Sequence, residues 1–240
     1  MKYMTVSPRQ KARMAGVFYL ITIALGVVAQ GGIADRLVKY SDAAATAANI
    51  TAHGDLFRLA FALFMIEQVA LVVVSMLVYE LLKPVSRTAS LLAAVLGVVG
   101  SGIKAMSRLF YLAPVIVLGG APYLNTFSTE QLHALALVFI RVNNAGAAIA
   151  LVFFGFSTLL QGYLIIRSTF LPHVLGWLAL VGGAGWLAFL WPPLGNALFV
   201  YIALFAIIGA LAMIGWLIVV GVDDARWTAE AEAAAASIWR

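Results

Sequence analysis

The chain has no cysteine, only three histidines, and few charged residues. Without cysteine, disulfides, thiolate metal sites, cysteine nucleophiles and iron–sulfur clusters are all excluded. Three histidines are too few for a histidine-rich metal site, and no zinc-protease, nucleophile-elbow or phosphate-loop motif occurs. Neither a metal nor an organic cofactor is therefore predicted. Charged residues make up 10% of the chain, against about a quarter in a soluble domain.

Apolar residues are abundant: they account for 64% of the 240 residues, and the mean hydropathy is +1.02. A soluble fold with so few polar residues has too little polar surface to coat such a core, so lipid is the solvent that fits. The composition predicts an all-α, polytopic membrane bundle of six transmembrane helices, since a span needs about 20 apolar residues. The apolar stretches cover residues 12–29, 56–82, 89–118, 132–166, 174–191 and 197–220.

The basic residues are distributed unevenly over the predicted loops. If the helices alternate in direction, one side carries most of the basic residues, and these are Lys2, Arg9, Lys11, Arg13, Lys83, Arg87, Arg167, Arg226 and Arg240. The opposite side has Arg36, Lys39 and Arg58. By the positive-inside rule, both termini are predicted to be cytoplasmic. This distribution explains the net charge of +5 without a basic stripe, so nucleic acid is not an expected partner.

Two further segments are expected to be helical. Ser41 or Asp42 can cap an alanine-rich helix that Gly54 ends, and Asp55 then caps the second span. This predicts a short extracytoplasmic helix between spans one and two. Residues 1–222 are interpreted as one transmembrane domain and residues 223–240 as a polar cytoplasmic tail or helix. Alternatively, the first apolar stretch is a signal peptide, with a cleavage-like site in Val28-Ala29-Gln30-Gly31.

Several ionisable or amide side chains interrupt the apolar stretches: Glu67, Gln68, Lys104, Arg108, Arg141, Asn143 and Asn144. An ionisable residue inside a span is costly and by default indicates a functional site. At about 1.5 Å of rise per residue, Glu67 lies about 24 Å from Lys83, and Lys104 lies about 26 Å from Arg87. Because the hydrocarbon layer is about 30 Å thick, these charges are predicted to lie in its outer part.

The spacing of these residues predicts which helix faces they occupy. Lys104, Arg108 and Tyr111 share one face of the third span. Arg141 and Asn144 share a face of the fourth span, and Asn143 is predicted to point elsewhere. Three cations then face one anion, and the positive excess indicates a site for a carboxylate, a phosphate or a lipid headgroup. The candidate ligand-binding residues are Glu67, Lys104, Arg108, Tyr111, Arg141 and Asn144.

These residues suit more than one function. The first hypothesis is a binding or transport protein with a basic outer-leaflet pocket for an anionic amphiphile or small anion. The second is a membrane enzyme in which Glu67 acts as general acid or base on a lipid-soluble substrate. The third is an accessory subunit, with a homo-oligomer or a partner subunit packed on small residues. A structural interpretation also stays open, in which Glu67 pairs with Lys104 or Arg141 and the other cations snorkel.

Several strings in a fixed order resemble one known family. They are ARMAGVFYL at 12–20, DAAATAANI at 42–50, FRL at 57–59, LKPV at 82–85, FFG at 153–155, GYLIIRS at 162–168 and LP at 171–172. Together they resemble the bacterial membrane family catalogued as domain of unknown function 4386, from about Arg9 to Val220. The resemblance implies a multi-helix protein of the bacterial inner membrane. It supplies no activity and no catalytic residue.

Overall fold

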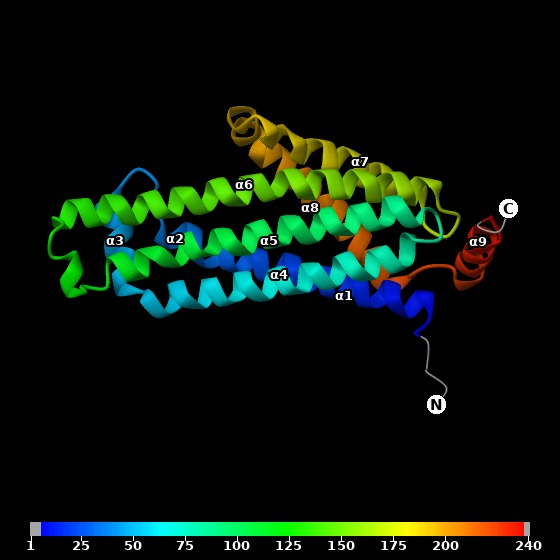
Figure 1. Cartoon of the computed structure of the whole chain (residues 1–240), viewed down its shortest axis with the longest axis horizontal. Coiled ribbons are helices and arrows are strands. Elements are labelled where there is room, and N and C mark those ends of the chain that lie inside the picture. Colours follow the sequence, from blue (N-terminus) through cyan, green and yellow to red (C-terminus); the bar gives the residue numbers. More distant parts are fainter. Residues whose placement is uncertain (1–5, 238–240) are drawn as a thin grey trace. The chain divides into compact units, whose positions relative to one another are not determined.

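The structure, a computed structural model, describes residues 6–237, and these residues form helices joined by short connections (Figure 1). Lys2 and Arg240, which contributed to the charge distribution above, lie outside the described residues. The helices are α1 (Pro8–Val27), a π-helix η1 (Val28–Ala34), α2 (Asp35–Leu37), α3 (Ala43–Ala52), α4 (Gly54–Leu82), α5 (Arg87–Val117), a 3₁₀-helix η2 (Pro122–Leu124), α6 (Thr129–Arg167), α7 (His173–Trp186), a 3₁₀-helix η3 (Leu187–Leu190), α8 (Pro192–Val219) and α9 (Asp224–Ser237).

Six helical segments are long and apolar enough to cross a membrane, which confirms the predicted all-α membrane bundle. They are Pro8–Leu37, Gly54–Leu82, Arg87–Val117, Thr129–Arg167, His173–Leu190 and Pro192–Val219. Large apolar side chains cover their outer surfaces: Leu204, Ile208 and Leu211 of α8, for example, are at least half exposed. Such surfaces suit lipid, because large contiguous apolar patches are rare on soluble monomers.

The first span is longer than its hydropathy predicts. It does not end near Ala29, because the chain continues through the π-helix η1 and α2 to Leu37. Gln30, Gly31 and Gly32 lower the hydropathy of this segment, yet the backbone keeps its helical hydrogen bonds in the wider π form. Local hydropathy therefore marked the end of the apolar run and not the end of the helix.

The predicted helix between spans one and two is confirmed as α3. The Asp42 carboxylate accepts a hydrogen bond from the backbone N–H of Ala45 at 2.9 Å, which makes Asp42 the N-cap. The predicted roles of Gly54 as the end of this helix and of Asp55 as the cap of the second span were wrong. His53 is the C-cap of α3, α4 already begins at Gly54, and Asp55 lies in its first turn.

The chain divides into two compact units, which we describe separately. Within the described residues, unit 1 comprises residues 6–20, 70–100 and 150–237, and unit 2 comprises residues 21–69 and 101–149. In unit 1, α7 and α8 run side by side (Figure 1). In unit 2, α3 packs against α2, and the Asn49 amide donates to the Leu37 carbonyl oxygen at 3.0 Å.

Unit 1 is packed through glycines on α6 and α7. A Cβ atom on Gly162 would lie 2.8 Å from the carbonyl oxygen of Gly176, and one on Gly183 would lie 2.9 Å from the carbonyl oxygen of Gly155. These backbones touch because neither helix carries a side chain at the crossing. Small residues commonly permit such close approach where lipid supplies no hydrophobic drive between helices.

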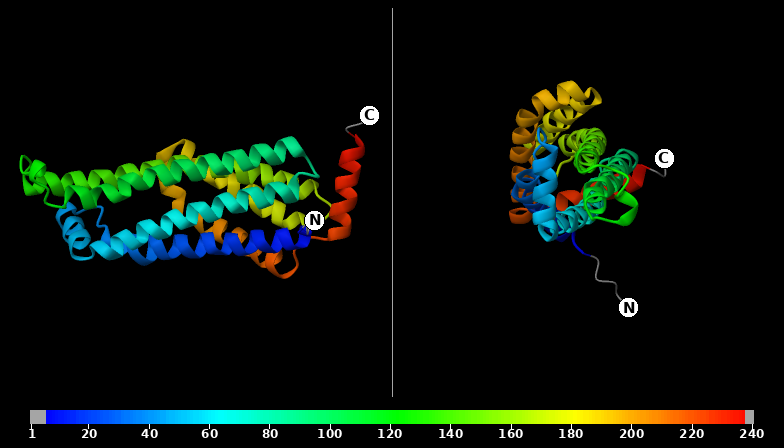
Figure 2. Two further views of the ribbon diagram at one scale, coloured as in Figure 1. Left: turned by 60° about the horizontal axis from the view of Figure 1, so that its bottom comes forward. Right: turned by 90° about the vertical axis from the view of Figure 1, so that its left-hand side faces the viewer.

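The C-terminal helix α9 lies across the ends of other unit 1 helices (Figure 2). The indole N–H of Trp227 donates to the Leu81 carbonyl oxygen at 2.8 Å. Asp224 accepts from the backbone N–H of Arg9 at 2.7 Å, and Glu230 accepts from the Thr169 hydroxyl at 2.6 Å. The helix is thereby fastened to the start of α1, the end of α4 and the loop before α7.

Candidate ligand-binding site

An ion pair within unit 2 joins α4 to α5. Lys104 Nζ lies 2.7 Å from Glu67 Oε1, and the two side chains are 19% and 7% exposed. Gly26 of α1 leaves room for this carboxylate, because a Cβ atom there would lie 3.3 Å from Glu67 Oε1. The second carboxylate oxygen, Oε2, is buried and has no hydrogen-bond partner among the described residues. Of the two partners predicted for Glu67, the structure brings it to Lys104.

Arg108 lies one turn along α5 from Lys104 and is only 3% exposed. Its Nη1 donates to the Asn143 side-chain oxygen at 3.1 Å, and its guanidinium carbon lies 3.6 Å from the centre of the Phe64 ring. This ring supplies a cation–π contact, which stabilises a desolvated cation. Arg108 Nε has no acceptor, and Arg108 forms no ion pair with any carboxylate in residues 6–237.

Two further buried polar side chains lie in the same part of unit 2. Tyr111 stacks on Phe57 with ring centres 4.2 Å apart, and its hydroxyl has no partner among the described residues. Gln68 is 3% exposed, and neither atom of its amide has a partner there. Since more than about nine in ten buried polar groups are hydrogen-bonded, this concentration is unusual. We call Glu67, Gln68, Lys104, Arg108, Tyr111 and Asn143 the polar cluster.

The predicted facing of α6 was wrong. Asn143, expected to point elsewhere, is 2% exposed and accepts from Arg108, whereas Arg141 and Asn144 are exposed. The buried face of α6 follows Ala136, Ile140 and Asn143, at the helical spacing of four and three. The prediction placed Arg141 on the inner face of α6 because it is charged, but the packing of α6 against Arg108 decides which face is buried.

Arg141 and Asn144 instead bind one residue that sequence reasoning missed. Arg141 Nη2 donates to the Tyr40 carbonyl oxygen at 2.8 Å, and the Asn144 amide donates to the Tyr40 hydroxyl at 2.9 Å. Asn143 connects this exposed group to the polar cluster through its 3.0 Å hydrogen bond to Asn144. No sequence signal marked Tyr40, which precedes α3 and lies far from α6 along the chain. Phe64 had a signal, since it lies three residues before Glu67 on the same helix face.

The chemistry of the polar cluster is that of an anion site with a small charge excess. Lys104 and Arg108 oppose Glu67, so the buried excess is one positive charge and not the two that counting Arg141 predicted. Within the described part of the chain, no three histidine, aspartate or glutamate side chains gather as metal ligands do. The free donors of a guanidinium suit the oxygens of a carboxylate or a phosphate.

Six helices that are long and apolar enough to cross a membrane define the class: a multi-pass integral membrane protein. The chain belongs to the family described as Domain of unknown function (DUF4386), whose model matches residues 14–221. The match reaches all six apolar helices and confirms the family indicated by the sequence strings. Searches of the curated proteins and of the solved structures give no match to this chain.

Proposed function

We propose that this membrane protein binds or carries an anionic group at the polar cluster of unit 2. The ligand is the carboxylate or phosphate of an amphiphile, or a small anion. The protein works without a metal or an organic cofactor, in the cytoplasmic membrane of a bacterium and with both termini in the cytoplasm. The observation that carries the proposal is the buried guanidinium of Arg108, which forms no ion pair with a carboxylate among residues 6–237.

Burying the charge of Arg108 costs free energy. An uncompensated buried ion costs several kcal/mol, even after the surroundings relax. The Asn143 oxygen and the Phe64 ring offset part of this cost for Arg108, but Nε still has no acceptor. An anion that accepts from Nε completes the coordination of the guanidinium and neutralises the excess charge. Binding energy of this kind is available only to an anionic ligand.

A ligand is expected to approach the cluster beside Lys104, whose side chain is 19% exposed while Arg108 is 3% exposed. Binding therefore requires side-chain movement, and the Lys104–Glu67 ion pair is the contact that an anion competes with. The Glu67 carboxylate can turn, because its Oε2 has no hydrogen-bond partner among the described residues.

The enzyme alternative has less support. It needs Glu67 as a general acid or base, but this carboxylate is held by Lys104 at 2.7 Å and no second buried carboxylate accompanies it in the described chain. An accessory subunit would use an exposed helix face, and the exposed side chains of α8 fit lipid equally well. Neither alternative explains why Arg108 is buried.

The test is direct binding to purified protein in a neutral detergent, measured by native mass spectrometry with oleate, oleyl alcohol and inorganic phosphate as probes. We expect an anionic probe to bind and the neutral alcohol not to bind. Arg108→Gln should weaken anion binding about tenfold or more, because a charge-assisted hydrogen bond is lost.

The matched control is Arg58→Gln in the same unit. Arg58 is exposed and pairs with Asp55 at 3.2 Å, so its loss should leave binding unchanged. Equal binding of oleate and oleyl alcohol, or an Arg108→Gln protein that binds as the wild type does, would refute the proposal.

A further inference from the structure

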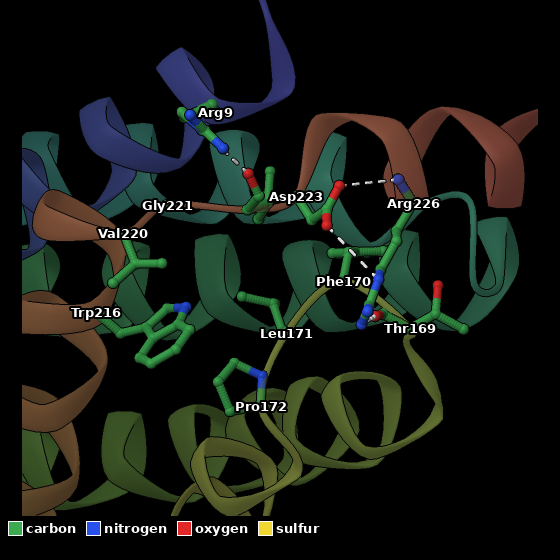
Figure 3. A pocket seen from close by; sticks show the side chains of 11 residues that line it. Arg9, Thr169, Phe170, Leu171, Pro172, Trp216, Val220, Gly221, Asp223 and Arg226 are labelled. Carbon is green, nitrogen blue, oxygen red and sulfur yellow. Dashed lines mark hydrogen bonds and ion pairs between the residues drawn. The ribbon is translucent and has the colours of Figure 1, made fainter.

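A second site lies in unit 1, where none of the candidate residues is found. A pocket of about 400 Å³ opens between the start of α1, the loop before α7, the end of α8 and the start of α9 (Figure 3). This volume is within the range of small-molecule sites, about 300–1,000 Å³. Two arginines, Arg9 and Arg226, reach it from α1 and α9, and Trp216 reaches it from α8.

The charges lining the pocket leave an excess of one positive charge. Arg226 is engaged, since Nε lies 3.5 Å from the Asp223 carboxylate and Nη1 donates to the Thr169 carbonyl oxygen at 3.3 Å. Arg9 donates from Nε to the Val222 carbonyl oxygen at 3.4 Å and forms no side-chain ion pair in residues 6–237. The guanidinium of Arg9 is therefore the charge available to a ligand.

Beside this charge lies an indole N–H without an acceptor. Trp216 Nε1 is buried and has no hydrogen-bond partner among the described residues. Leu171, Pro172 and Val220 add apolar surface to the same pocket. Among the described residues, the pocket thus combines a cation without an ion-pair partner, a buried donor that needs an oxygen, and apolar carbon. Buried donors in proteins are nearly always satisfied, so this one points to an oxygen-bearing ligand.

The position of the pocket along the spans identifies the kind of ligand. Arg9 is in the first turn of α1, and Val220 directly follows the last residue of α8. Both apolar helices begin or end here, so the pocket lies at the level where a membrane has its headgroups. Tryptophan is enriched at this level, and basic pockets at helix ends bind lipid headgroups.

We infer that this pocket binds the phosphodiester headgroup of an anionic phospholipid. The phosphate oxygens accept from Arg9, an ester carbonyl oxygen accepts from Trp216 Nε1, and the first acyl carbons lie on Leu171, Pro172 and Val220. The Asp223 carboxylate stays with Arg226 and limits the charge, so one phosphate is the expected load. This site is independent of the polar cluster in unit 2.

The experiment measures lipid binding to the delipidated full chain in neutral detergent by native mass spectrometry. Phosphatidylglycerol is the probe, diacylglycerol is the same lipid without phosphate, and glycerol 3-phosphate is the headgroup without tails. We expect phosphatidylglycerol to bind, diacylglycerol to bind at least tenfold more weakly, and glycerol 3-phosphate not to bind. Arg9→Gln should weaken phosphatidylglycerol about tenfold, as for one charge-assisted hydrogen bond.

Arg13→Gln is the matched control, because Arg13 is an exposed arginine of α1 that does not line the pocket. Trp216→Phe is the second variant: it replaces the indole by a smaller phenyl ring, so that the N–H is lost, and should weaken binding of the same lipid severalfold. Each variant is first checked by size-exclusion chromatography, and the Trp216→Phe result decides the matter if Arg9→Gln does not fold. Equal losses in Arg13→Gln and Arg9→Gln overturn the proposal, as does tighter binding of glycerol 3-phosphate than of phosphatidylglycerol.

Discussion

Unit 1 and unit 2 bury polar groups in opposite ways. The buried serines of unit 1 are short and donate to backbone carbonyl oxygens: the Ser157 hydroxyl donates to that of Ala93 on α5 at 2.7 Å, and the Ser168 hydroxyl donates to that of Ile165 at 2.8 Å. Unit 2 buries a full carboxylate and a full guanidinium, Glu67 and Arg108, and both keep atoms that have no hydrogen-bond partner in residues 6–237.

The two units also differ in what fills the space between helices. Unit 1 brings backbones into contact at glycines such as Gly162 and Gly183. In unit 2, the Tyr111 ring stacks on Phe57 and meets Phe64 edge to face. Closely packed backbones hold one geometry, and incompletely bonded charges leave room for a further partner. The glycine contacts of unit 1 therefore serve stability, and the buried charges of unit 2 suit ligand binding.

The largest effect is expected from breaking the buried ion pair of unit 2. Lys104→Met leaves the Glu67 carboxylate buried without its counter-ion, which should lower the free energy of unfolding by about 3 kcal/mol. The measurement is an SDS titration in mixed micelles, followed by circular dichroism. Adding Glu67→Leu should restore most of the stability. A single variant as stable as the wild type would show that this charge is already solvated.

The glycine contacts of unit 1 should give the next largest effect. In Gly183→Ala the new Cβ would lie 2.8 Å from the Leu159 backbone nitrogen, so α7 must move away from α6. We expect a loss of about 2 kcal/mol, a typical cost of overpacking. The neighbouring Gly182→Ala is the control, since nothing lies within 4 Å of its Cβ position, and it should not destabilise. Equal stability of the two variants would remove the role assigned to the helix crossing.

A smaller effect is expected where α9 joins unit 1. Trp227→Phe keeps an aromatic ring, a smaller phenyl, but removes the N–H that donates to the Leu81 carbonyl oxygen, and the loss of this bond should cost about 1 kcal/mol. Thermal unfolding in detergent measures it. Trp177→Phe is the control because Trp177 is 59% exposed, and its melting temperature should equal that of the wild type. A larger shift in Trp177→Phe than in Trp227→Phe would contradict this attachment.

The smallest effect should come from the exposed charges of unit 2. Arg58→Gln removes an i,i+3 pair with Asp55 whose side chains are largely exposed, and such pairs contribute little. The unfolding midpoint in the SDS titration should not change. Compared with Lys104→Met, this variant separates burial from charge. A shift as large as that of Lys104→Met would mean that the net charge of unit 2, and not the buried pair, sets its stability.

The fold was largely predictable because its signals are local. Long apolar runs identified all six spans, and Asp42 before an alanine-rich segment identified α3. The candidate site was only partly predictable, because side chains from different helices meet there. Spacing placed Lys104, Arg108 and Tyr111 on one face of α5, where Arg108 and Tyr111 are buried and Lys104 is partly buried.

Residues at the helix–helix contacts were harder to predict. Helical spacing allowed either Asn143 or Arg141 to face inward, and only the packing of α6 against α5 favours the amide. Tyr40 was missed because it lies in a connection between helices, and such a connection has no periodicity. The π-helix at Val28–Ala34 was missed because its hydrogen bonds depend on backbone packing and not on hydropathy.

The attachment of α9 also bears on how the protein is made. Asp224 accepts from the backbone N–H of Arg9, two residues separated by 215 positions. A ribosome therefore releases the first span long before its fastening exists, and the start of α1 waits in the membrane while the other five spans insert. Helix α9 is synthesised after all six spans and binds the start of α1, the end of α4 and the loop before α7. Closure of unit 1 therefore waits for α9, and a chain truncated before Asp224 lacks the segment that joins α1 to α4 and to the loop before α7.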